Sequence, residues 1–199
     1  MSQPATAAKL TSRDLINVGV FTAIYFAIQF LLGMLGIIGP VFMFVGFVII
    51  ILANGIVVAL YLARVPKLGV MTIMGFIIGL LMVLTGHPWQ VLLVATGFGL
   101  IADLIAKSGQ FRSPIRNIVS YAVFTTWMIS PLLPMLWNQD AYSSYITKSM
   151  GAEYAKSFFE LFNANTMGYI AIFFFVMGLV GGALGQRVLR RQFRRAGVA

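Results

Sequence analysis

The sequence predicts an all-α polytopic membrane protein, a bundle of six transmembrane helices. Three observations lead to this fold class. Of the 199 residues, 60% are hydrophobic and only 10% are charged, and the charges lie between long apolar blocks and at the chain ends. A soluble domain carries about 25% charged residues, so lipid rather than water must surround most of this surface. The apolar blocks have about the length, roughly 20 residues, that spans a bilayer as a helix.

These blocks divide the chain into three parts. Residues 1–10 are expected to be a disordered cytoplasmic N-terminus, residues 11–189 a six-helix transmembrane domain, and residues 190–199 a basic cytoplasmic tail. The predicted helices cover residues 11–35, 40–63, 69–85, 88–106, 114–137 and 165–188. The first block is too long for the apolar region of a signal peptide, so it is interpreted as a retained helix.

Short connections separate the first four predicted helices. Gly36 and Gly39 make a turn, and Pro40 follows where the first turn of a helix tolerates proline. Residues 64–67 carry two basic side chains and connect the second and third helices. Residues 86–89 form the next turn. Such short links favour antiparallel neighbours in the bundle.

The later part of the chain departs from this simple pattern. Pro131 and Pro134 lie in the last third of the fifth helix and should kink it or end it early, because proline lacks an N–H donor. Residues 138–163 form a long polar stretch. Within it, residues 152–162 are predicted to form a short amphipathic helix at the membrane interface.

Lys and Arg residues are distributed unevenly between the connections. Twelve of the 14 fall on one side of the predicted membrane, and only Lys148 and Lys156 fall on the other. Because basic residues mark cytoplasmic connections, both termini should be cytoplasmic. Residues 36–40, 86–89 and 138–164 should then lie outside. The predicted location is the cell membrane, which the chain crosses several times.

The residue inventory argues against several function classes. There is no cysteine, and the single histidine excludes a multi-histidine metal cluster within this chain. No phosphate-binding Gly-x-x-x-x-Gly-Lys-Ser/Thr loop is present. No predicted span carries an ionisable residue near its midpoint, where an ion-coupled carrier usually needs one. We therefore predict no catalytic residue, no metal site and no cofactor, and we expect that the chain is not an enzyme.

A stripe of small residues follows one side of the first predicted helix. Gly19, Ala23 and Ala27 recur every four residues and therefore share a face. Small side chains let a second helix approach closely in lipid. The stripe either packs against another helix of the same bundle or docks a separate membrane subunit.

The sequence over residues 9–195 resembles the S components of energy-coupling factor (ECF) transporters, and more narrowly the MptD-like, or Trep_Strep, group. The resemblance rests on residues 9–27, 85–89 and 99–109, which read KLTSRDLINVGVFTAIYFA, TGHPW and GLIADLIAKSG. In the wider class an Ala-x-x-x-Ala motif on the first helix docks the coupling subunit. Ala23 and Ala27 match that motif here. Gly19 extends the stripe but lies outside the motif.

The resemblance implies a function. The chain would be the membrane-embedded substrate-binding (S) subunit of an ECF-type ABC importer. It would capture a small organic micronutrient, such as a vitamin, a cofactor precursor or haem, and deliver it inward. Its partners would be a transmembrane EcfT-like coupling subunit and two EcfA-like ATPase subunits. The alternatives are a self-contained small carrier or channel, which usually needs buried ionisable groups or paired broken helices, and an intramembrane lipid-modifying enzyme.

Polar and aromatic residues near the predicted outer helix ends are candidates for the substrate site, because ligand sites combine apolar walls with a few polar groups. The candidates are His87, Trp89, Gln90, Gln29, Trp137, Asn138, Asp140, Tyr142, Asn163 and Asn165. Each class has an alternative role. Tryptophan and tyrosine at this depth also anchor helices in the headgroups, and asparagine also caps helix ends. The histidine is either a ligand contact, for example to haem iron, or a turn residue.

Two polar residues lie within predicted helices rather than at their ends. Asn54, in the middle of the second helix, is expected to make a hydrogen bond to another helix. Asp103 precedes Lys107 by four residues and is expected to form an ion pair with it.

Overall fold

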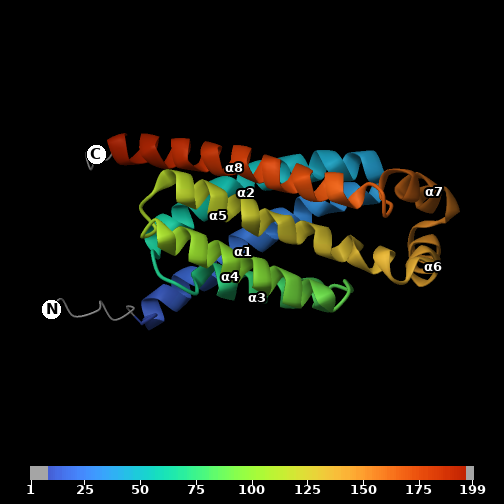
Figure 1. Ribbon diagram of the computed structural model, residues 1–199, viewed down its shortest axis with the longest axis horizontal. Coiled ribbons are helices and arrows are strands. Elements are labelled where there is room, and N and C mark those ends of the chain that lie inside the picture. Colours follow the sequence, from blue (N-terminus) through green and yellow to red (C-terminus); the bar gives the residue numbers. More distant parts are fainter. Residues whose placement is uncertain (1–8, 196–199) are drawn as a thin grey trace.

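The computed structural model describes residues 9–195, and in this part of the chain every regular element is a helix (Figure 1). The α-helices are α1 (Ser12–Gly33), α2 (Pro40–Arg64), α3 (Val70–Leu84), α4 (Gln90–Ser108), α5 (Pro114–Thr125), α6 (Gln139–Met150), α7 (Ala152–Leu161) and α8 (Met167–Arg195). Two 3-10 helices, η1 (Met34–Ile37) and η2 (Thr126–Leu136), continue α1 and α5. Within the described residues, five spans are long and apolar enough to cross a membrane, and α3 is a shorter apolar helix. The all-α membrane fold class is therefore confirmed.

The helices run roughly side by side along the long axis of the molecule (Figure 1). The beginning of α1 and the end of α8 lie at one end, and α6 and α7 lie at the other. The two basic residues of the predicted outer side, Lys148 and Lys156, belong to α6 and α7. The basic end of α8 is therefore separated from them by the full length of the bundle. Which end faces the cytoplasm stays a prediction.

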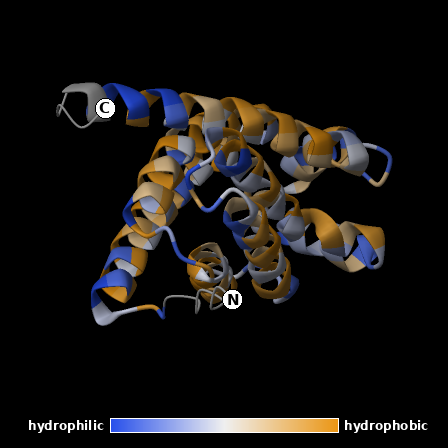
Figure 2. Ribbon diagram, turned by 60° about the vertical axis from the view of Figure 1, so that its left-hand side comes forward, coloured by the Kyte–Doolittle hydropathy of each residue, from blue (hydrophilic) through white to orange (hydrophobic). Residues whose placement is uncertain are grey.

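The sides of the bundle are apolar. Large hydrophobic side chains such as Ile16 on α1, Leu93 on α4 and Ile172 on α8 are exposed. Figure 2 shows hydrophobic residues along the helices and hydrophilic residues at the end of α8. A soluble monomer rarely exposes apolar patches of this extent. This surface suits the hydrocarbon core of a bilayer.

The observed elements differ from the predicted ones in the fifth helix, in the last helix and in the polar stretch between them. α5 ends at Thr125 and continues as the 11-residue 3-10 helix η2, which contains Pro131 and Pro134. This confirms the early end that the two prolines suggested. The last helix continues to Arg195, so the start of the predicted basic tail is helical. Arginine is a good helix former, and neither glycine nor proline interrupts residues 189–195.

The predicted outer polar stretch contains more structure than expected. α7 lies where the amphipathic helix was predicted, and α6 precedes it as a second helix. Gly151, with φ of 91°, separates the two and allows the sharp change of direction. The predicted disordered N-terminus and the end of the tail fall largely on residues 1–8 and 196–199, which lie outside the described residues.

Glycines bring neighbouring helix backbones into direct contact. Gly55 on α2 faces Gly181 and Gly185 on α8, and a Cβ atom on Gly181 would lie 2.6 Å from the Ile51 carbonyl oxygen. Between α3 and α4, a Cβ atom on Gly79 would lie 2.7 Å from the Cα atom of Leu92. Such close approach maximises van der Waals contact, which drives helix association in lipid.

Asp103 joins α4 to the beginning of α3 instead of pairing with Lys107. Its fully buried carboxylate accepts hydrogen bonds from the backbone N–H groups of Met71 and Thr72, at 3.1 and 2.8 Å, and from the Thr72 hydroxyl at 2.6 Å. The residue at the N-cap of α3, Gly69, has no side chain to do this. The expected ion pair was wrong because a buried carboxylate gains more from free N–H donors at a helix N-terminus. Lys107 is exposed.

Replacing Asp103 is expected to destabilise the bundle strongly. Asp103→Ala leaves the N–H donors of α3 buried without an acceptor, which should cost about 3 kcal/mol. Asp103→Asn keeps one acceptor oxygen and should cost less. Thermal unfolding in detergent would measure both variants against Asp140→Ala, which removes an exposed carboxylate. Equal melting temperatures for Asp103→Ala and Asp140→Ala would contradict this role.

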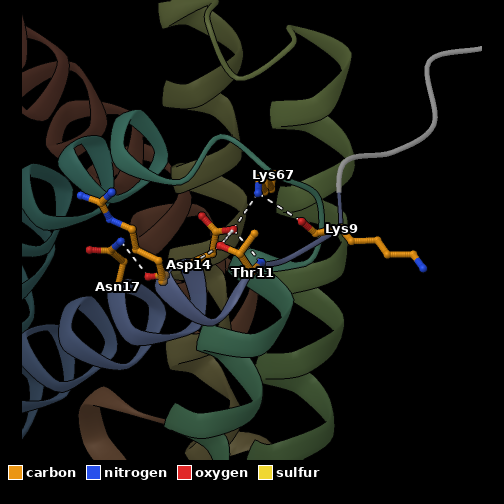
Figure 3. Close-up of polar contacts among 6 residues, drawn as sticks. Lys9, Thr11, Asp14, Asn17 and Lys67 are labelled. Atoms are coloured by element: carbon orange, nitrogen blue, oxygen red, sulfur yellow. Dashed lines mark hydrogen bonds and ion pairs between the residues drawn. The ribbon is translucent and has the colours of Figure 1, made fainter.

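An ion pair fixes the beginning of α1 to the α2–α3 connection (Figure 3). Thr11 and Asp14 form a capping box, in which the Thr11 N–H donates to the Asp14 carboxylate at 2.8 Å. The same carboxylate pairs with the Lys67 ammonium at 2.6 Å, and Lys67 also donates to the Lys9 carbonyl oxygen. A partly exposed pair adds little stability by itself. Its effect here is to set where α1 lies against α2 and α3.

Candidate functional site

The first helix presents two chemically different faces. Its buried residues are Val18, Thr22, Tyr25 and Gln29. Their spacing of three and four residues places them on one inward face. The small residues Gly19, Ala23 and Ala27 are all exposed. They therefore do not pack within the bundle, and the intramolecular interpretation of this stripe was wrong.

The inward face of α1 meets polar groups from two other elements. The Trp127 indole N–H on η2 donates to the Tyr25 hydroxyl at 3.3 Å. The Asn54 amide on α2 donates to the Tyr25 carbonyl oxygen at 3.4 Å, which is the expected bond between helices. The Tyr25 ring lies edge-on to Phe124, with 5.8 Å between ring centroids. Tyr25 is thus the centre of the contact between α1 and the opposite helices.

Several polar atoms around this centre have no partner in the protein. They are Thr22 Oγ1, Gln29 Oε1, Asn54 Oδ1 and Ser130 Oγ, and all are buried. A buried polar atom without a hydrogen bond costs about 1–3 kcal/mol, so a concentration of them needs an explanation such as a bound molecule. We call the set of these residues with Tyr25 and Trp127 the inner polar seam. Its members supply hydrogen-bond acceptors and two aromatic side chains.

The seam borders the break in the fifth span. Trp127 and Ser130 lie on η2, directly after α5 ends. At the junction the Thr125 hydroxyl donates to the carbonyl oxygens of Ala122 and Phe174, at 2.8 and 3.1 Å. Irregular backbone at membrane depth is tolerated where it is buried in protein or lines a cavity. Substrate sites of transporters are typically formed by such interrupted helices.

The chemistry of the seam suits binding. Its carboxamide oxygens accept hydrogen bonds and its hydroxyl groups accept or donate them, while no carboxylate lies among its members. Among the described residues, no group of three or more His, Asp, Glu or Cys side chains comes together. Acceptors of this kind are complementary to N–H or O–H donors, and the aromatic side chains are complementary to apolar groups.

Gln29 is the one predicted site residue that lies in the seam. Trp89 and Trp137 are 63% and 58% exposed, as expected for side chains that anchor helices in headgroups. Gln90 is half-buried at the start of α4, and its Oε1 atom has no partner in the protein. Asn138 is the exposed N-cap of α6, without a side-chain hydrogen bond. These four residues are not brought together into one site.

His87 behaves as a turn residue. Its Nδ1 atom lies 3.1 Å from the Met82 carbonyl oxygen and 3.3 Å from the Thr85 hydroxyl. A carbonyl oxygen can only accept a hydrogen bond. The bond to Met82 therefore requires the proton on Nδ1 of His87. Burial lowers the pKa of His87, against the opposing effect of the bond to Met82, and the ring is neutral at pH 7.

The remaining candidates belong to the outer helices and their ends. Tyr142 packs on Phe158 of α7, with 6.3 Å between ring centroids, and Asp140 is exposed in the first turn of α6. Asn163 Oδ1 accepts from the backbone N–H groups of Asn165 and Thr166, at 3.1 and 3.2 Å, immediately before α8. The capping interpretation therefore describes Asn163. Asn165 contributes only its backbone N–H to this arrangement, and the residue is exposed.

Sequence reasoning missed four members of the seam. Thr22 and Tyr25 carry a signal that could have found them, because with Gln29 they repeat at three and four residues opposite the small-residue stripe. Trp127 and Ser130 carry a weaker signal. Their orientation follows from the change to 3-10 geometry at Thr126.

The comparisons with known proteins identify the family. The family model Trep_Strep, described as a hypothetical bacterial integral membrane protein, matches residues 12–195. No curated protein and no solved structure matches the chain. The matched range includes every span of the bundle and every residue of the seam.

Proposed function

Because the chain belongs to the Trep_Strep family of hypothetical bacterial integral membrane proteins, we propose that it is the substrate-binding subunit of an ECF-type importer. It would take a small organic molecule from outside and deliver it inward with an EcfT-like coupling subunit and two EcfA-like ATPases. The two faces of α1 carry this proposal. One helix presents unpartnered polar atoms to the bundle interior and an exposed small-residue stripe to the membrane.

The inner polar seam is the proposed substrate site. Gln29 and Asn54 supply acceptor oxygens, and Tyr25 and Trp127 supply aromatic surface. The substrate would therefore carry hydrogen-bond donors on a partly apolar body, as many vitamins and cofactor precursors do. Binding would repay the cost of burying the seam's polar atoms, which favours the loaded state of the bundle.

The small-residue stripe is the proposed docking face. A Cβ atom added to Gly19 would meet nothing within 4 Å, and both alanines are exposed. Lipid chains gain nothing particular from small side chains, whereas a second helix gains close backbone contact. The stripe therefore favours a helix of a membrane partner over lipid. Because the seam shares this helix, docking and substrate binding would act on the same element.

The source of energy also favours a partner. The seam contains no carboxylate that could bind a coupling ion. The sequence contains no phosphate-binding loop for ATP. Uphill transport through this chain would then need ATPases on other subunits. The same observations weigh against a self-contained ion-coupled carrier.

Access to the seam would be controlled by the outer helices. The Tyr154 hydroxyl of α7 donates to the Gly36 carbonyl oxygen at 2.8 Å. Phe162 stacks on Phe44 of α2, with 5.0 Å between ring centroids. These contacts hold α7 across the end of the bundle where α1 turns into α2. Substrate from outside would pass this cover.

The proposed function is tested in two stages, and the compound identified in the first stage is used in the second. Mass spectrometry first identifies small molecules that co-purify with the protein but not with Gln29→Leu/Ser130→Ala. Uptake of that compound is then measured in ATP-loaded liposomes. We expect uptake by the chain together with its coupling complex, and none by the chain alone. The seam variant should lose uptake because its acceptors are gone.

Gln139→Leu is the matched control, because it removes an exposed amide on α6, outside the inner polar seam. It should transport like the wild type. Transport by the isolated chain would contradict the proposal and favour a self-contained carrier. Chemical conversion of the compound would favour an intramembrane enzyme.

A further inference from the structure

A cavity lies at the end of the bundle opposite α6 and α7. It has a volume of about 280 Å³ and lies between the ends of α2 and α8, the α4–α5 connection and the start of α5. The residues that define its character are Leu62, Phe111, Arg112, Asn117, Gln186 and Leu189. None belongs to the inner polar seam, so this cavity is separate from the proposed substrate site.

Asn117 gives the cavity a fixed acceptor. Its amide nitrogen donates to the Phe111 carbonyl oxygen at 2.9 Å. A carbonyl can only accept, so the amide orientation is determined and Oδ1 points away from that bond. Asn117 is 7% exposed, and its Oδ1 atom is buried without a protein partner. An N–H or O–H group that reached this atom would supply the missing hydrogen bond.

Two other polar side chains complete the lining. Gln186, which is 9% exposed, contributes a carboxamide from α8. Arg112 contributes a guanidinium from the α4–α5 connection, and this residue is exposed. No acidic residue is among the lining residues. The cavity thus combines one positive charge with an acceptor that requires an N–H or O–H group.

The apolar part of the lining indicates where such a ligand comes from. Leu62 and Leu189 belong to the ends of candidate spanning helices, near the predicted boundary of the membrane. A guanidinium binds a phosphodiester, and a hydroxyl group donates to the Asn117 oxygen. Basic cavities between membrane helices on the cytoplasmic side are suited to anionic headgroups.

We propose that this cavity binds the phosphoglycerol headgroup of an anionic phospholipid. Arg112 holds the phosphodiester, and a glycerol hydroxyl donates to Asn117 Oδ1. Gln186 bonds a second oxygen of the headgroup. The site would fasten the α4–α5 connection to the end of α8 through one lipid molecule. A soluble glycerol phosphate offers the same polar groups without the acyl chains.

The test uses native mass spectrometry of the purified protein with defined lipids. The lipids are dioleoyl phosphatidylglycerol, phosphatidylmethanol, phosphatidylethanolamine and phosphatidylcholine. Phosphatidylmethanol keeps the negative phosphodiester and lacks the glycerol hydroxyls. We expect phosphatidylglycerol to bind at least about 5-fold tighter than each of the others, the ratio expected for one buried hydrogen bond or one basic contact.

Variants separate this site from general surface charge. Arg112→Gln and Gln186→Leu should each weaken phosphatidylglycerol binding about 5-fold. Lys107→Gln removes an exposed charge at the same end but outside the cavity, and it should have no effect. Equal losses for Arg112→Gln and Lys107→Gln would overturn the proposal. So would equal binding of phosphatidylmethanol, or tighter binding of phosphatidylethanolamine. Soluble glycerol phosphate that binds as tightly as the lipid would overturn the lipid assignment.

Discussion

Gly185→Leu is expected to prevent the six spans from assembling into a stable bundle. Gly185 of α8 lies directly against the carbonyl group of Gly55 on α2, and a Cβ atom there would also lie 2.9 Å from the Ala59 Cβ atom. Backbone cannot move aside as the tip of a flexible side chain can. The added side chain must push α2 and α8 apart, which should cost about 3 kcal/mol or more. Size-exclusion chromatography in detergent and thermal unfolding would report the loss.

Gly168→Leu is the matched control, because it places the same side chain on the same helix. A Cβ atom at Gly168 would meet nothing within 4 Å, and the residue is exposed. This variant should purify as a monodisperse protein with a melting temperature near that of the wild type. If both variants lost stability alike, close packing at Gly185 would not explain the effect.

Ala23→Leu/Ala27→Leu is expected to abolish association with the coupling complex that we propose, while leaving the chain folded. Both alanines are exposed, so leucine at these positions does not crowd the bundle. It would instead hold a partner helix away from the backbone of α1. Loss of a central contact of this kind should weaken binding roughly 100-fold. Co-purification from membranes that contain the coupling and ATPase subunits would measure it.

The control for this variant adds similar bulk elsewhere on the lipid-facing surface. Gly97→Leu/Ala183→Leu changes exposed residues on α4 and α8 and should keep the complex intact. Substrate retention by Ala23→Leu/Ala27→Leu should stay unchanged, because Tyr25 and Gln29 face the other way. A variant that loses the ligand as well as the partner would show that α1 had been disturbed as a whole. An intact complex would exclude the stripe as the docking face.

The transmembrane architecture could be predicted because lipid imposes simple rules on sequence. Each apolar block had to become a helix, since no water is available to satisfy its backbone. The prolines of the fifth span predicted that its α-helix ends early. That the span continues as the 3-10 helix η2 depends on packing. α6 could not be seen from hydropathy, because residues 139–150 form a helix at the interface without an apolar block.

The candidate site was harder to predict, because it depends on helix rotation. Hydropathy places Tyr25 and Trp127 in the first and fifth spans, but it says nothing of which way their side chains face. Their hydrogen bond joins residues 102 positions apart in the sequence. The aromatic residues near the helix ends were predicted to line the site, but Trp89 and Trp137 face outward. Asp103 was misjudged for the same reason, since its partners come from another helix.

The shortness of α3 has a consequence for the surrounding bilayer. With 15 residues the helix measures about 22 Å, against a hydrocarbon thickness of about 30 Å. On the flank formed by α3 and α4, a bilayer that matched the short helix would be thinner than beside α2 and α8. Such a one-sided deformation stores elastic energy in the lipid. A tilted orientation of the whole bundle, or a neighbour that covers the thin flank, would relieve it.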